Sequence, residues 1–187
     1  VYHLYEVFQV VNEEKIPCWP GPMTVEEYWN GTCNPENLHI SSSWCYGNAG
    51  VMRGLQKVAG YMGWKEKEQA HVETMIRFFS QNIKTYDLYS PSLCHGFSSL
   101  VAIQMCAYSS YRNPKLLTNL ERHIQKMIAG YRKNNENELN LTDIRNKSIL
   151  IEGHLKDLSI LTGSVGIAIT LLSLKRKTKT GKLLMID

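Results

Sequence analysis

Three glycine-bearing turns along the chain each run directly into a strongly hydrophobic stretch. Glycine allows a tight turn and close packing of the backbone, and a helix that is apolar nearly all round is buried. We therefore expect one buried helix after each turn. The turns begin at Gly47, Gly96 and Gly163, and the hydrophobic stretches that follow them cover 51–60, 100–109 and 167–172.

Two further helices are predicted between these hydrophobic stretches. Residues 65–83 have Met75, Phe78 and Phe79 among their apolar positions and are expected to form an outer helix behind the first buried one. A second outer helix is expected to open at Pro114 and to run to about residue 131, since proline is well suited to the first turn of a helix.

The spacing of the glycine turns is that of an irregular repeat. Gly47 and Gly96 are 49 positions apart, and Gly96 and Gly163 are 67 positions apart. A repeat of such long period is typical of a helical array in which neighbouring units bury each other's faces. The pattern thus predicts an all-α fold, in one domain at this chain length.

The other segments are less regular. Residues 2–11 are predicted as a short helix, and residues 134–147 as a polar, asparagine-rich loop. Residues 13–37 are predicted to be rich in turns because four prolines punctuate them.

Composition excludes several classes of protein. No apolar run is long enough to span a membrane and no signal peptide opens the sequence, so a cytoplasmic protein is expected. Five cysteines are an odd number, and they lack the dense spacing of a secreted disulfide framework. Cys18, Cys33 and Cys106 are interpreted as free thiols.

The net charge of +4 is small for 187 residues, and much of it comes from residues 175–182. One interpretation is a solvated helix end, where basic side chains complement the helix dipole. The other is a contact with anionic lipid or with an acidic partner. Nucleic-acid binding has no motif to support it.

The candidate chemistry lies in two of the glycine turns. Cys45 stands in the first, just before Tyr46 and Gly47, and Cys94 and His95 stand in the second, just before Gly96. Thiolate and imidazole bind zinc readily, and three protein ligands leave a fourth position open for water or substrate. By spacing alone this signal is modest, because a Cys-His pair is usually unrelated to metal and no C-x-x-C knuckle is present.

The sequence around these residues resembles the LanC-type lanthionine synthetases, the cyclases of lantibiotic biosynthesis. Residues 44–50 match that family's W-C-Y-G-x-x-G motif, residues 94–96 match its C-H-G motif, and residues 161–168 resemble its last G-x-x-G helix start. The likeness extends from about Trp19 to the end of the sequence. Tyr46 is similar to the stand-alone cyclases, since the fused two-function synthetases tend to have histidine there.

The resemblance implies a fold and a metal site. The fold would be part of an α/α toroid, with inner and outer helices in a ring, and residues 1–187 would be the C-terminal portion of the cyclase domain. Cys45, Cys94 and His95 would bind one zinc ion, and Tyr46 would lie beside it as a candidate catalytic residue.

The sequence also departs from the family pattern. Ser99 stands where the second turn normally has another glycine, and Ser41 stands where members often have arginine. The family's proton-handling histidine and aspartate have no match here. The other histidines are interpreted as surface or packing residues: His3, His39, His71, His123 and His154.

Three functions are compatible with these observations. The first is a zinc-dependent cyclase that adds cysteine thiols of a dehydrated precursor peptide to dehydroalanine or dehydrobutyrine. The resemblance then implies a dehydratase and an exporter as partners and a peripheral position at the inner face of the cell membrane. The second is a non-catalytic module that binds a peptide or partner, and the third is an enzyme that adds glutathione to dehydrated residues.

Overall fold

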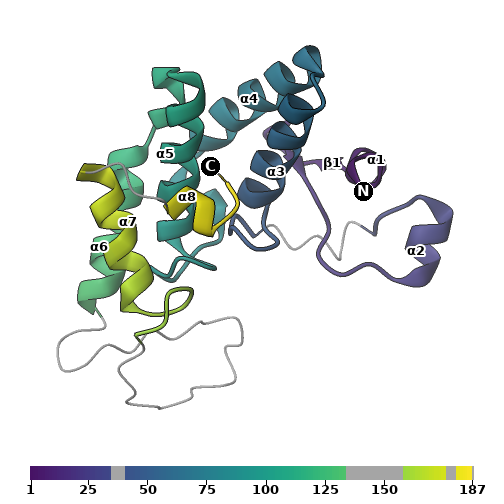
Figure 1. Ribbon diagram of the computed structural model, residues 1–187. Coiled ribbons are helices and arrows are strands. Elements are labelled where there is room, and N and C mark those ends of the chain that lie inside the picture. Colours follow the sequence, from purple (N-terminus) through teal and green to yellow (C-terminus); the bar gives the residue numbers. More distant parts are fainter. Residues whose placement is uncertain (35–40, 134–157, 176–179, 187) are drawn as a thin grey trace.

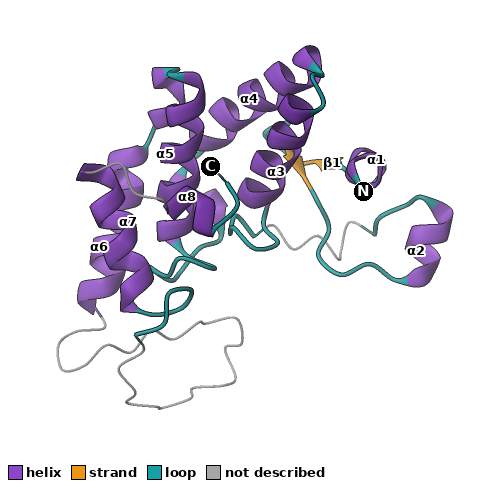
Figure 2. Ribbon diagram, in the orientation of Figure 1, coloured by secondary structure: helices purple, strands orange, loops and turns teal. Residues whose placement is uncertain are grey.

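The computed structural model of the chain describes residues 1–34, 41–133, 158–175 and 180–186. These residues are mostly helical, and the sheet among them is a single pair of short strands (Figures 1 and 2). The all-α prediction is therefore confirmed. The predicted loop at 134–147 lies outside the described residues.

Two of the three helices that follow the glycine turns each pack against one outer helix. Helix α3 (Asn48–Tyr61) packs against α4 (Lys65–Phe79), and α5 (Phe97–Tyr111) packs against α6 (Leu120–Lys133). Helices α3 and α5 also contact each other, and α7 (Ser164–Lys175) contacts α5 on its other side. Helices α3, α5 and α7 thus form one layer, with α4 and α6 behind it (Figure 1).

Helix α7 is less buried than its hydrophobic sequence predicts. Gly166, Ile167 and Thr170 are buried, but Leu172 and Ala168 are exposed. The expectation of all-round burial is wrong here because the main contacts of α7 among the described elements are with α5 and the short helix α8 (Thr180–Leu183), which leave part of its surface uncovered.

The outer helices are shorter than predicted. Helix α4 ends at Phe79, and a separate 3₁₀ helix η2 (Ile83–Tyr86) follows, with Asn82 as its N-cap. Pro114 begins another 3₁₀ helix, η3 (Pro114–Leu117), instead of α6 itself. Asn119 separates η3 from α6 in a left-handed conformation and donates its side-chain amide to the carbonyls of Phe79 and Gln81.

The N-terminal helix is also shorter than predicted. Helix α1 (Tyr2–Val7) is followed by strand β1 (Val10–Val11), which pairs antiparallel with β2 (Pro17–Cys18). The valine pair favours a strand over a helical continuation. Helix α2 (Val25–Asn30) lies within the stretch predicted as turns, and a capping box between Thr24 and Glu27 begins it.

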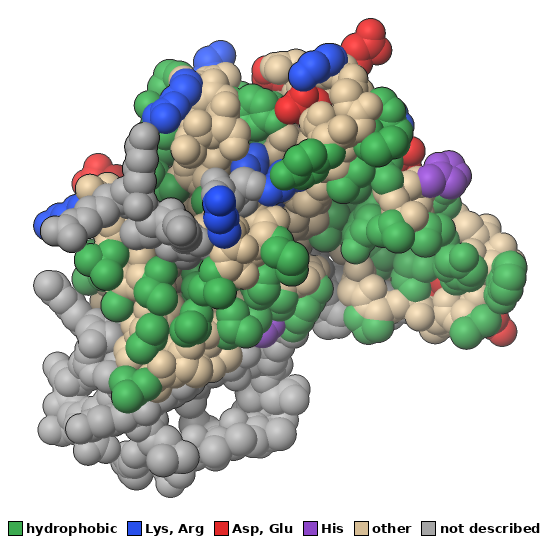
Figure 3. All heavy atoms as spheres, in the orientation of Figure 1, with side chains coloured by type: hydrophobic (Ala, Val, Ile, Leu, Met, Phe, Trp, Pro, Cys, Tyr) green, Lys and Arg blue, Asp and Glu red, His purple; other side chains and the backbone are tan. Residues whose placement is uncertain are grey.

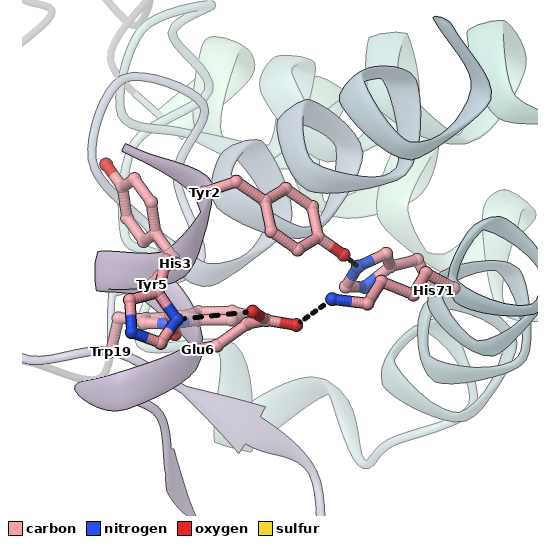
Figure 4. Close-up of polar contacts among 7 residues, drawn as sticks. Tyr2, His3, Tyr5, Glu6, Trp19 and His71 are labelled. Atoms are coloured by element: carbon pink, nitrogen blue, oxygen red, sulfur yellow. Dashed lines mark hydrogen bonds and ion pairs between the residues drawn. The ribbon is translucent and has the colours of Figure 1, made fainter. Parts of the chain in front are cut away.

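Polar contacts connect helix α1 to α4 (Figure 4). The hydroxyl of Tyr2 lies 2.6 Å from Nε2 of His71, and Lys67 pairs with Glu6 at 2.5 Å. On the other side of α1, the indole of Trp19 donates to the carbonyl oxygen of Tyr5 at 2.7 Å. Hydrophobic side chains remain exposed around α1 and α2 (Figure 3).

Among the described residues, no helix combines the length and the hydrophobicity needed to cross a bilayer. The long helices are instead buried against each other around one hydrophobic cluster, which includes Met52, Phe79 and Ile103.

One polar pair lies inside this core. His123 of α6 is fully buried, and its Nδ1 lies 2.7 Å from Oε1 of Gln104 on α5. The amide group of Gln104 donates to the carbonyls of Leu116 and Thr118, so Oε1 accepts and Nδ1 of His123 is the donor. Nε2 has no hydrogen-bond partner among the described residues. Burial accordingly lowers the pKa of His123 to about 4.

This buried histidine predicts a stability loss in mild acid. The pKa of His123 is below its ordinary value of 6.5, so the unfolded chain binds the proton more tightly than the folded chain. The associated stability is complete above pH 6.5 and is lost as the pH falls toward 4, by about 3 kcal/mol in all.

The measurement is the free energy of unfolding of metal-free protein between pH 7.5 and 4.5, for the wild type and for His123→Phe. Carboxylates with lowered pKa, such as Glu6 and Glu68, weaken both proteins in acid. The wild type should therefore lose more than the variant does. Parallel pH profiles would show that His123 contributes nothing to the acid sensitivity.

Candidate metal centre

The two turns that contain the candidate ligands share one backbone design. The N–H of Asn48 donates to the carbonyl of Ser41 at 2.8 Å, and the N–H of Phe97 donates to the carbonyl of Ser90 at 2.9 Å. In both cases the first residue of a helix closes a loop of the same length. The ligand residues stand inside these loops, immediately before helices α3 and α5.

Glycine is required in each loop because backbone lies where a side chain would be. A Cβ added at Gly47 would be 2.1 Å from the nitrogen of Ser43, and one added at Gly96 would be 2.2 Å from the oxygen of Ser90. These distances are far shorter than a van der Waals contact. The atoms that the Cβ would meet belong to the main chain, so they cannot move away as a flexible side chain could. The glycines identified in the sequence therefore fix the loops through close packing.

The fold brings the three candidate ligands together. Sγ of Cys45 lies 2.9 Å from Nε2 of His95, and Sγ of Cys94 lies 3.6 Å from the same nitrogen. All three donor atoms lie within 4.8 Å of one another. Tetrahedral zinc would separate sulfur and nitrogen ligands by about 3.5 Å. The distance from Cys94 to His95 already fits this value, and the distance from Cys45 to His95 would have to lengthen by about half an ångström, so the donor set could hold a metal ion.

The two sides of the cluster differ in burial. Cys94 is 7% exposed and its N–H donates to the carbonyl of Leu161 at 2.8 Å, so the third glycine turn supports the second one. His95 is half-buried, whereas Cys45 is exposed. An ion held here would be reached from solvent on the Cys45 side, which is the geometry of a site with an open coordination position.

Tyr46 lies at the open side of the cluster. Its side chain is 47% exposed, and its ring lies 5.3 Å from the imidazole of His95, tilted by 60°. The phenol is therefore near the ligands yet accessible from solvent. This position suits a group that contacts a bound substrate.

The two serines that depart from the family pattern are part of the turns. Ser41 accepts from Asn48 through its carbonyl, and its hydroxyl donates to the hydroxyl of Ser43. Ser99 is buried, and its hydroxyl donates to the carbonyl of Gly96 at 2.7 Å. Both serines therefore contribute to loop structure.

The described histidines other than His95 make their contacts elsewhere. His3 and His71 lie at the junction of α1 and α4 (Figure 4), and His123 lies in the core. His39 and His154 lie outside the described residues. The interpretation of His3, His71 and His123 as surface or packing residues agrees with these contacts.

Sequence reasoning missed two residues that connect the first turn to a distant segment. The indole of Trp44 donates to the carbonyl of Leu184 at 2.9 Å, and Nε of Arg53 donates to the carbonyl of Ile186 at 2.7 Å. Arg53 is only 1% exposed. The available signal was an arginine within a hydrophobic stretch predicted to be buried, because a buried cation needs acceptors.

Comparison with known proteins agrees with these features. A family model described as lanthionine synthetase C-like protein matches residues 8–185, which is nearly the whole chain. No curated protein matches the chain.

The space around two glycines predicts that the same substitution to alanine has opposite effects on the free energy of unfolding. Gly96→Ala should destabilise the fold by about 2 to 3 kcal/mol, because its Cβ overlaps the main chain of Ser90. Gly54→Ala should stabilise it by about 0.5 to 1 kcal/mol, because Gly54 is an exposed position within α3 whose Cβ would meet no atom within 4 Å. Denaturant unfolding of both variants measures the difference, and equal effects would contradict the packing argument.

Proposed function

Because the chain belongs to the lanthionine synthetase C-like family, we propose that it is a zinc-dependent cyclase. It activates cysteine thiols of a dehydrated precursor peptide for addition to dehydroalanine or dehydrobutyrine, which forms lanthionine or methyllanthionine rings. The observation that supports this most is the convergence of Cys45, Cys94 and His95 from two separate turns.

The donor set suits the chemistry of a thiol. A free thiol with a pKa near ~8.5 is mostly protonated at neutral pH, and bound zinc supplies the positive charge that converts it to the thiolate. Cys45 and Cys94 would hold the ion as thiolates and would offset its charge, which would leave an incoming peptide thiolate with more of its electron density. A site with three histidines would make a stronger Lewis acid and would suit water activation instead.

The protein residues have distinct tasks in the reaction. The exposed side at Cys45 admits the peptide, while buried Cys94 and its bond to Leu161 keep the opposite side rigid. The peptide sulfur forms a bond to the β-carbon as the carbon–carbon double bond is lost, and the α-carbon then takes a proton. Tyr46 would orient the substrate or deliver that proton, and its position next to His95 and open to solvent supports this role.

The cellular setting follows from the same proposal. The enzyme works in the bacterial cytoplasm, at the inner face of the membrane beside a dehydratase and an exporter, as the family resemblance implies. Its main partner is its substrate, the dehydrated precursor peptide.

Zinc content tests the metal assignment. We expect about one zinc per chain by elemental analysis, with loss of the metal and a lower melting temperature in Cys45→Ala and in Cys94→Ala, since closing a metal site across two helix starts contributes folding free energy. Cys106→Ala is the matched control, because Cys106 lies on α5 outside the donor cluster. Unchanged zinc content in either ligand variant would refute the assignment.

A thiol-consumption assay tests the reaction itself. Cyclisation leaves the peptide mass unchanged but removes a free thiol, so alkylation followed by mass spectrometry should show fewer labelled cysteines over time with the wild type. Cys94→Ala should be at least about 100-fold slower, because it loses metal-assisted formation of the thiolate. Zinc binding with glutathione addition only would favour the glutathione-adding enzyme, and zinc binding without either reaction would favour the binding module.

A further inference from the structure

Residues 180–186 form a short segment that is fixed in the core by its alternate side chains. Leu184 and Ile186 are buried, whereas Met185 between them is 80% exposed. The N–H of Ile186 donates to the carbonyl of Gly181, and the N–H of Met185 donates to that of Lys182. With Met185 in a left-handed conformation, these bonds are those of a Schellman motif that closes α8.

The segment is hydrogen-bonded to the part of the chain that contains Cys45. Trp44, the residue before this ligand, donates its indole N–H to the carbonyl of Leu184. Arg53, on the helix that follows the same turn, donates to the carbonyl of Ile186. Its guanidinium also donates to the hydroxyl of Ser110 at 3.0 Å, near the end of α5. Arg53 thus links the segment to two helices.

The segment also contacts the part of the chain that follows the other two ligands. Helix α8 packs against α5, which begins directly after Cys94 and His95, and against α7 (Figure 1). The 180–186 segment therefore lies across both ligand-bearing units and is bonded or packed to each of them.

The Cys45 side is the part of the cluster that needs such support. Cys94 is buried and its own N–H is bonded to Leu161, whereas Cys45 is exposed. The Trp44 indole provides an anchor one residue from this exposed ligand. A change at that anchor would move Cys45 relative to the other two donors.

We propose that Trp44 is a positioning residue for the metal centre, and that the 180–186 segment is the support against which it places Cys45. The proposal rests on the metal-binding function proposed above. Trp44 acts through Cys45 and not on the metal itself, so its contribution is to the affinity and geometry of the bound ion.

The test is metal affinity in Trp44→Phe, which keeps an aromatic ring and removes the indole donor. Zinc affinity is measured by competition with a chelator of known affinity, and cobalt(II) is used as a spectroscopic probe of the ligand geometry. We expect about tenfold weaker zinc binding and altered thiolate-to-cobalt and d–d bands, as is typical when a group that orients a ligand is lost.

Trp19→Phe is the matched control. Trp19 also donates its indole N–H to a backbone carbonyl, that of Tyr5 at 2.7 Å, but this bond holds α1 and not the 180–186 segment. The control should lower the melting temperature while leaving metal affinity and the cobalt spectrum as in the wild type. Equal weakening in both tryptophan variants would reduce the effect to general destabilisation and overturn the proposal.

A second pair of variants changes the segment from its exposed side. Met185→Pro removes the N–H that bonds to Lys182 and excludes the left-handed backbone, so it should release the segment and weaken zinc binding as Trp44→Phe does. Met185→Gly keeps the motif and should bind zinc as the wild type does. Adding Trp44→Phe to Met185→Pro should cause no further loss of zinc affinity, since both changes break the same connection between Trp44 and the 180–186 segment.

The outcomes separate this proposal from the one on which it rests. A wild type that binds no zinc would overturn both. A wild type that binds zinc, together with a Trp44→Phe variant within twofold of it and with the same cobalt spectrum, would overturn the positioning role alone. Full additivity of Trp44→Phe and Met185→Pro would likewise show that the segment does not act through Trp44.

Discussion

The candidate site depends on the packing of α3 against α5. Cys45 and His95 are 50 residues apart in sequence, yet the atoms that could bind a metal must lie within a few ångströms of each other. Each ligand turn is closed by its own hydrogen bond, so neither turn depends on the other for its shape. The contact between α3 and α5, the helices that follow the two turns, brings the turns together.

The same construction explains why the site is asymmetric. The second turn is bonded to the third through Cys94 and Leu161, and its helix α5 lies between α3 and α7. The first turn lies at the edge of the layer formed by the described helices, and its ligand is exposed. The proposed cyclase would need such an arrangement, because a peptide thiol would have to reach a bound ion while the remaining ligands keep their positions.

Proton handling is the part of the proposed chemistry with the fewest candidates among the described residues. His123 is buried in the core with a lowered pKa, and His71 is bonded to Tyr2 on the outer layer. Tyr46 is the described titratable side chain that contacts His95 through its ring. The family motif and the ring contact with His95 thus both make Tyr46 the candidate for this role. The sequence alone gave only its place in the motif.

The sequence determined the local features: the presence of a helix directly after each of the three glycine turns, the residue types of the donor set and the requirement for glycine before α3 and α5. These follow from hydrophobic periodicity and from turn chemistry within a few residues. Helix ends at Phe79 and Val7 were missed, because polar groups at Asn82 and a valine pair at 10–11 compete with helix continuation. Only the tertiary structure decided that Trp44 and Arg53 bond to the 180–186 segment. Those bonds join donors to backbone carbonyls more than 130 positions away. Every residue has such a carbonyl, so no pattern in the sequence can mark which one a buried donor will find.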